Sequence, residues 1–155
     1  MNKISWVGAV VFSLICVFGH AQKSEWSKEL NEAPVFIRDY YVQQYKDVNP
    51  EESLVHWQST GLGGGRSASP VFDPKYYLER NPDVAKKIGS TNYLGAALHW
   101  LEYGIQDGRP SHPEFDIKYY VKNNRDLYQQ FGLDFRKLIM HYLETGYAEG
   151  RSASP

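Results

Sequence analysis

The chain has 155 residues, a formal net charge of −1 at pH 7 and a single cysteine. This length is enough for one modest domain, and the near-neutral charge excludes the basic excess that marks a nucleic-acid-binding protein. Aromatic residues make up 15% of the sequence, so we expect a core built largely from aromatic side chains.

The N-terminal residues have the pattern of a secretory signal peptide. Lys3 precedes a nearly uninterrupted apolar run over residues 4–18, and the small residues Gly19 and Ala21 fit a signal-peptidase site. The run is shorter than the about 20 apolar residues that a membrane-spanning helix needs. We therefore expect residues 1–21 to be removed, the mature chain to be secreted to an extracellular location, and no membrane span to remain; an uncleaved anchor is the alternative.

After a predicted capping segment at residues 22–34, the chain divides into three copies of one pattern. We place the copies at residues 35–70, which is shortened in its middle, 71–113 and 114–155. Each copy carries a phenylalanine, a pair of tyrosines, an aspartate, a histidine followed by an aromatic residue, a glycine, and a glycine–arginine pair, in this order. The hexapeptide GRSASP occurs at residues 65–70 and again at 150–155. Such recurrence predicts one structural unit per copy.

The first copy is expected to contain fewer helices than the others. Asn49-Pro50 has the residue types of a helix start, because asparagine caps free backbone N–H groups and proline fits the first turn. The spacing between the aspartate and the histidine is shorter here than in the other copies. We therefore expect the middle helix to be absent and the last helix to follow directly.

The second copy has the clearest helix boundaries. Asp73-Pro74 begins a helix by the same capping logic. Asn81-Pro82 ends that helix and begins a second one, which stops at Gly89. A third and longest helix has a broad apolar face; it includes Tyr93 and ends at Gly104.

The third copy repeats this plan. Asn124 precedes the second helix, Gly132 follows it, and the third helix includes Phe135 and ends at Gly146. No stretch shows the sustained two-residue alternation of a half-buried strand. We therefore expect an all-α fold in which three short-helix repeats stack as a small solenoid or a compact helical array.

The second copy also carries a resemblance to known proteins. It reads FDPKYYLERNPDVA and then HWLEYGIQDGR, and it resembles a repeat module of bacterial secreted and cell-surface proteins. The resemblance covers residues 35–155. The third copy departs from the module at Asn124-Arg125, where the module has Asn-Pro, and the first copy departs most. The resemblance implies an extracellular setting and no particular reaction.

One histidine recurs in every copy, followed by an aromatic residue and then by a glycine. We expect structural roles for His56, His99 and His141, for Trp57, Trp100 and Tyr142, and for Gly61, Gly104 and Gly146. One histidine per copy cannot build a zinc site, because zinc ligands lie about 2 Å from the metal whereas packed helices lie about 8–10 Å apart. Each histidine is expected to hydrogen-bond a neighbouring copy or a loop, and Gly146 to take a positive φ at a helix end.

Two recurring residue types are candidates for binding. They are the arginines Arg66, Arg109 and Arg151 and the first tyrosines of the pairs, Tyr40, Tyr76 and Tyr119. The arginines would suit acidic sugars or carboxylates, or would form ion pairs with the recurring aspartates Asp47, Asp83 and Asp126. In each tyrosine pair we expect one ring to face the core and the other to be partly exposed, because adjacent positions lie about 100° apart on a helix. The tyrosine pairs and tryptophans are either sugar-stacking platforms or core residues.

These features favour a secreted, non-enzymatic helical repeat protein that binds an extracellular polysaccharide, matrix component or protein. A structural component of an extracellular matrix or coat is the alternative, and a secreted hydrolase with an unrecognised site is a third hypothesis. We expect no catalytic residue, metal site or cofactor. The glycine-rich stretch at residues 61–66 lacks the Lys-Ser/Thr of a phosphate-binding loop, and nucleic acid is not an expected partner.

Overall fold

The computed structural model describes residues 28–155, and every regular element within this range is a helix. The all-α prediction is therefore confirmed. The predicted signal peptide at residues 1–21 and the first part of the predicted capping segment lie outside the described residues. Within the described range, no helix has both the length and the apolar character needed to cross a membrane.

The first segment, residues 35–70, has the reduced set of helices that its sequence predicts. It contains α2 (Arg38–Gln44), a 3₁₀ turn η1 (Pro50–Glu52), α3 (Ser53–His56) and a π turn η2 (Trp57–Gly61). Asn49 caps η1, since its side chain accepts a hydrogen bond from the N–H of Glu51 at 3.0 Å. The described stretch between α2 and η1 contains no helix, as expected.

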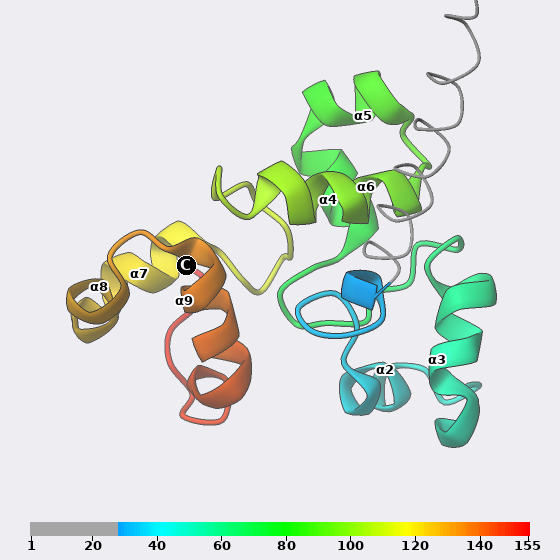
Figure 1. Cartoon of the computed structure of the whole chain (residues 1–155), viewed down its shortest axis with the longest axis horizontal. Coiled ribbons are helices and arrows are strands. Elements are labelled where there is room, and N and C mark those ends of the chain that lie inside the picture. Colours follow the sequence, from blue (N-terminus) through cyan, green and yellow to red (C-terminus); the bar gives the residue numbers. More distant parts are fainter. Residues whose placement is uncertain (1–27) are drawn as a thin grey trace, which may run out of the picture.

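The second segment (residues 71–113) and the third (residues 114–155) share one order of elements (Figure 1). The second contains α4 (Pro74–Arg80), α5 (Pro82–Ile88), α6 (Tyr93–His99) and the π turn η3 (Trp100–Gly104). The third contains α7 (Ile117–Asn123), α8 (Arg125–Phe131), α9 (Phe135–His141) and the π turn η4 (Tyr142–Gly146). Asp73 caps α4 by accepting from the N–H of Tyr76 at 2.9 Å, and Gly89 follows α5 with a φ of 104°, which residues with side chains rarely adopt.

The last helix of every segment changes from α to π geometry directly after its histidine. No sequence signal predicted this change. Each π turn ends at the recurring glycine, so the predicted helix ends at Gly104 and Gly146 are confirmed, while the final turn is wider than an α turn.

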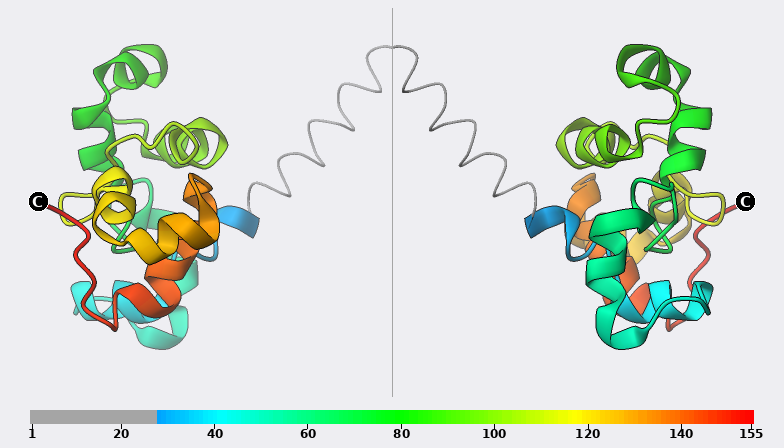
Figure 2. Two further views of the ribbon diagram at one scale, coloured as in Figure 1. Left: turned by 90° about the vertical axis from the view of Figure 1, so that its left-hand side faces the viewer. Right: turned by 90° about the vertical axis from the view of Figure 1, so that its right-hand side faces the viewer.

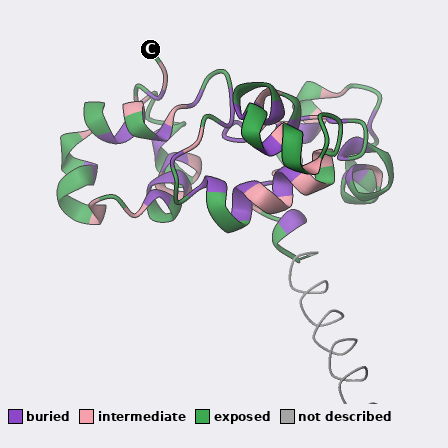
Figure 3. Cartoon of the chain, turned by 90° about the horizontal axis from the view of Figure 1, so that it is seen from above, coloured by how far each residue is buried: buried purple, intermediate pink, exposed green. Residues whose placement is uncertain are grey.

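Each segment is closed on itself by a backbone hydrogen bond. The N–H that precedes the first helix donates to a carbonyl near the end of the same segment: Ile37 to Ala68 at 2.8 Å, Asp73 to Ser111 at 2.8 Å and Asp116 to Ala153 at 2.7 Å. Extensive helix-to-helix packing accordingly occurs within the segments. Figures 1 and 2 show three helical groups joined by loops, and Figure 3 shows buried and exposed residues on different faces of the same helices.

An aromatic cluster fills the core of each segment. The buried members are Phe36, Tyr41 and Trp57 in the first segment, Phe72, Tyr77 and Trp100 in the second, and Phe115, Tyr120 and Tyr142 in the third. The rings of Phe72 and Trp100 stack with their centroids 4.5 Å apart and an interplanar angle of 18°. The predicted structural role of Trp57, Trp100 and Tyr142 therefore matches their place in the core.

Neighbouring segments meet where the glycine turn of one lies against two side chains of the next. Gly65 lies against Lys75 and Tyr93, and Gly108 lies against Lys118 and Phe135. A Cβ at either glycine would come within 2.7 Å of the lysine Cε and 2.8 Å of the aromatic ring. At the equivalent Gly150, no other described atom lies within 4 Å of that position. Within the described residues, no other segment covers the turn of the third segment.

Candidate functional site

The second tyrosine of each pair is held by the recurring histidine. The hydroxyl of Tyr41 lies 2.9 Å from Nδ1 of His56, that of Tyr77 lies 2.8 Å from Nδ1 of His99, and that of Tyr120 lies 3.0 Å from Nδ1 of His141. The structural role predicted for the histidines matches these contacts. The predicted partner was wrong, because each histidine bonds a tyrosine of its own segment and not a neighbouring copy or a loop.

Burial makes these tyrosine hydroxyls harder to ionise than an exposed tyrosine, which is itself protonated at neutral pH. It raises the pKa of Tyr120 to about 12, and it raises the pKa of Tyr77 as well, because the charged phenolate loses its hydration. Burial also lowers the pKa of His99 below its ordinary value. A neutral histidine and a neutral tyrosine therefore share the hydrogen bond in the second segment, which is the arrangement of a structural contact in a core.

The recurring glycine leaves room for the same tyrosine hydroxyl. A Cβ at Gly61, Gly104 or Gly146 would collide with the hydroxyl of Tyr41, Tyr77 or Tyr120, respectively. The prediction that Gly146 takes a positive φ was wrong: in the described residues, positive φ values occur at Gly65, Gly89, Gly108, Gly132 and Gly150. The recurring glycine is required by a close approach between two helices, and the glycine before each arginine by backbone conformation.

The three candidate arginines form ion pairs with the aspartates of their own segments. Arg66 bonds both carboxylate oxygens of Asp47 at 3.0 and 2.6 Å, Arg109 Nη1 bonds those of Asp83 at 3.0 and 2.9 Å, and Arg151 Nη1 bonds Asp126 Oδ2 at 2.7 Å. These bonds hold the pKa of each aspartate below its ordinary value. The ion-pair interpretation is thus confirmed, and an acidic ligand would have to compete with a carboxylate that is already bound.

The first tyrosines of the pairs are half-buried, whereas the second ones are buried, as predicted. Arg80 lies over the ring of Tyr76, with its guanidinium carbon 5.8 Å from the centroid. The hydroxyl of Tyr119 accepts a hydrogen bond from Ser152 Oγ at 3.3 Å. Tyr40 differs from these two because it lines a groove.

The groove lies between the first and third segments and has a volume of about 180 Å³. Its lining consists of Ile37, Asp39, Tyr40 and Gln43 at α2, Pro70 at the segment junction, and Leu143 and Tyr147 at and just after η4. Figures 1 and 2 show α2 and the turn that follows α9 at the same lower end of the molecule. Residues about a hundred positions apart thus form one surface, and Asp39 is the one charged group among those that line it.

Tyr147 is the most exposed ring of this groove. Its exposed fraction is 61%, whereas Leu62 and Ile105, which follow η2 and η3 at the equivalent positions, are 7% and 3% exposed. The ring packs edge-on against Tyr142, with centroids 5.9 Å apart and an interplanar angle of 84°. The third segment therefore presents a fixed aromatic surface where the other two segments have buried aliphatic side chains.

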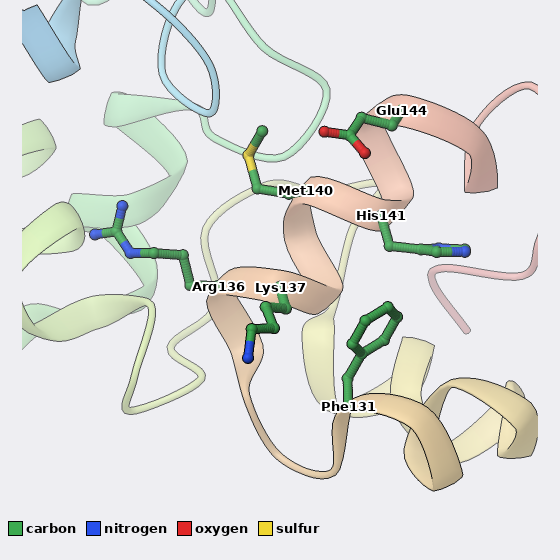
Figure 4. A pocket seen from close by; sticks show the side chains of 6 residues that line it. All are labelled: Phe131, Arg136, Lys137, Met140, His141 and Glu144. Atoms are coloured by element: carbon green, nitrogen blue, oxygen red, sulfur yellow. The ribbon is translucent and has the colours of Figure 1, made fainter.

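A second hollow of about 260 Å³ lies beside α9 (Figure 4). It is lined by Phe131, Arg136, Lys137, Met140, His141 and Glu144. Arg136 extends away from the others and donates to the carbonyl of Leu101 at 3.0 Å, while His141 extends in the opposite direction. The polar side chains of this hollow therefore point in different directions and do not converge on a common ligand position.

The sequence pattern predicted Tyr40 as a binding candidate but missed the other groove residues. The missed side chains include Asp39, Gln43, Leu143 and Tyr147. A signal for Tyr147 was present, because a tyrosine stands where the first two copies have Leu62 and Ile105. The approach of α2 to η4 had no such signal, since it depends on how distant segments pack.

Within residues 28–155, no group of three or more histidine, cysteine or acidic side chains could hold a metal ion. Comparisons of the chain with protein-family models, with curated proteins and with solved structures gave no match.

Proposed function

We propose that the chain is a secreted, non-enzymatic helical repeat protein that binds an extracellular partner, which is a polysaccharide, a matrix component or a protein. The observation that carries this proposal is the groove between α2 and η4, in which the half-buried Tyr40 and the exposed Tyr147 lie beside polar side chains. Aromatic rings with one wet edge are common in binding surfaces. Secretion rests on the sequence pattern of residues 1–21.

The repeat part of the proposal is supported by contacts that recur at equivalent positions. The tyrosine–histidine bond, the glycine that admits the tyrosine hydroxyl, the arginine–aspartate pair and the closing backbone bond each occur three times. Because each segment closes on itself, the three segments would be self-contained units that meet at their glycine turns and, for the first and third, at the groove.

The non-enzymatic part is supported by the partners of the titratable side chains. The recurring histidines bond core tyrosines, and the recurring arginines bond aspartates. General acid–base chemistry requires such a group within hydrogen-bonding reach of a substrate atom. The recurring histidines and arginines already have partners of their own, so none of them is placed to act on a substrate.

Binding is tested with the chain that begins at Gln22 and with beads that carry either polysaccharides or matrix proteins. We expect retention on at least one bead type, and we expect Tyr40→Ala to lose retention while Tyr76→Ala, at the equivalent position of the second segment, keeps it. Thermal melting of both variants checks that they fold. Equal retention of the two variants, or no retention of the parent chain on any bead, would contradict the proposal.

A structural component of an extracellular matrix or coat is the alternative function. It differs from the binding function in that copies of the chain would assemble with one another. Sedimentation velocity over a hundredfold range of protein concentration separates the two functions. A constant monomer mass supports the binding function, and a mass that grows with concentration supports assembly.

A further inference from the structure

The groove between α2 and η4 has the size and chemistry of a sugar subsite. Resting on the proposed binding function, we infer that this groove holds one neutral pyranose ring of a glycan chain. One face of the sugar lies on the ring of Tyr147, and the sugar hydroxyls bond Asp39 and Gln43. Four properties of the groove carry this assignment: its volume, its aromatic wall, its hydrogen-bonding groups and its charge.

The volume of the groove limits what can enter it. At about 180 Å³ it is smaller than the roughly 300–1,000 Å³ of sites that enclose a drug-sized molecule. It therefore accommodates one ring-sized unit. The two walls belong to a helix of one segment and to the end of another. A longer glycan can therefore extend beyond the groove while one of its sugars lies between the walls.

The aromatic wall is suited to the apolar face of a sugar. A pyranose carries its C–H bonds on its faces and its hydroxyls around its edge. The exposed ring of Tyr147 can contact such a face, and Leu143 and Pro70 extend the apolar surface. A tyrosine tolerates partial exposure here because its hydroxyl can remain hydrated while its ring is covered.

The hydrogen-bonding groups of the groove match a pair of neighbouring hydroxyls. Asp39 and Gln43 are four residues apart on α2 and therefore lie on the same face of that helix. The carboxylate of Asp39 only accepts hydrogen bonds, while the amide of Gln43 both accepts and donates. Two adjacent sugar hydroxyls, each a donor and an acceptor, can satisfy both side chains at once.

The charge of the groove selects against acidic ligands. Its lining contains the carboxylate of Asp39 and no cation, and the adjacent Arg38 is directed to Glu51, with Nη2 3.3 Å from the carboxylate. An acidic sugar would meet this carboxylate without a compensating positive charge. A proline-rich peptide is also a poorer match, because its backbone offers mainly carbonyl acceptors, and an acceptor cannot bond a carboxylate.

A buried histidine lies beside the hydroxyl of Tyr40. The N–H of Glu114 donates to Nδ1 of His112 at 3.1 Å, which leaves Nε2 as the protonated nitrogen of the neutral ring. Nε2 lies 3.5 Å from the hydroxyl of Tyr40 and faces it. Burial lowers the pKa of His112, so the ring keeps this neutral form.

Isothermal titration with neutral gluco-, galacto- and manno-oligosaccharides of four units tests the assignment, and uronic-acid oligosaccharides and a proline-rich peptide serve as competing classes. We expect a neutral oligosaccharide to bind. Tyr147→Ala should weaken that binding about tenfold or more, through loss of the stacking contact, and Tyr147→Phe should retain it. Gln43→Ala should weaken binding several-fold.

Each variant has a matched control of the same residue type. Tyr103→Ala removes a tyrosine that is 51% exposed in the second segment, and Gln44→Ala removes the neighbouring glutamine of α2. Both should bind the sugar within about twofold of the parent chain, and a thermal melt of every variant confirms folding.

Two results would overturn the inference, one by excluding the groove as the subsite and the other by excluding neutral sugars as the ligand class. If Tyr147→Ala binds as well as the parent, the groove is not the subsite. If uronic-acid oligosaccharides or the peptide bind and neutral sugars do not, the ligand class is wrong. Both results leave the proposed binding function intact, because the bead assay with Tyr40→Ala and Tyr76→Ala decides that function separately.

Discussion

At the scale of single residues, the recurring glycines are needed because a tyrosine hydroxyl lies directly against each of them. At Gly146 a Cβ would collide with the Tyr120 hydroxyl, while the other nearest atoms are 3.2 and 3.3 Å away. The hydroxyl in turn is held by the bond to His141. Glycine, tyrosine and histidine are therefore one unit, and none of the three can change without affecting the others.

Gly146→Ala should lower the free energy of unfolding by about 1–3 kcal/mol, because the added methyl group overpacks the core against a fixed ring. Urea unfolding of the parent and the variant measures the difference. Gly63→Ala is the matched control, since its nearest atom would lie 3.9 Å away, and it should change stability little. Equal effects of the two substitutions would contradict the close approach.

Tyr120→Phe removes the hydroxyl and should by itself cost about 1 kcal/mol through the lost hydrogen bond to His141. In that background, Gly146→Ala should cost distinctly less than in the parent chain, because the group it would collide with is gone. A double-mutant cycle measures this coupling. Additive effects of the two substitutions would show that the glycine and the hydroxyl do not interact.

His112, which is buried, and His99, which is half-buried, give the stability a pH dependence. Burial lowers the pKa of His99 and His112 in the folded chain, whereas an unfolded histidine titrates near about 6.5. Below that pH the unfolded state binds more protons, so the free energy of unfolding is highest above about 6.5 and falls as the pH drops further. Thermal melting between pH 4.5 and 8 should show this loss, and His112→Asn should reduce its slope. A melting temperature that is constant across the range would contradict neutral buried histidines.

At the scale of elements, local signals predicted the helix boundaries well. Asp73 and Asn49 act as caps where the sequence places them, and Gly89 follows its helix with a positive φ, because capping depends on neighbouring residues alone. The role of Gly146 was missed, since it depends on a contact with Tyr120 of another helix, and the π turns had no signal in the sequence. The same limit explains Tyr147: its sequence position was unusual, but its groove exists only where α2 approaches η4.

At the scale of the whole molecule, the segments are closed units that contact one another at a few points. Gly108 lies against Lys118 and Phe135 of the third segment, and Arg136 donates to the carbonyl of Leu101 in the second. Such an arrangement gives each unit its own core and a modest contribution from its neighbour. It also explains how a groove can remain between the first and third segments.

Removal of residues 114–155 should leave a folded but weakened remainder. The turn at Gly108 loses the cover of Phe135, and the Leu101 carbonyl loses its donor. We expect the free energy of unfolding of the first two segments to fall by about 1–3 kcal/mol. Differential scanning calorimetry compares the shortened and full chains. A remainder that melts at the same temperature would mean that the segments are independent, and one that is wholly unfolded would mean that they share a single core.

The most direct test of the central claim, that the groove is the binding surface, is an NMR titration. The amide resonances of the isotopically labelled chain are followed as a neutral tetrasaccharide is added. The largest shifts should fall at residues 37–43 and 143–147, on the two walls of the groove. Two results would contradict the claim. One is a set of shifts centred on the second hollow beside α9, and the other is the absence of shifts with a sugar whose polysaccharide beads retain the protein.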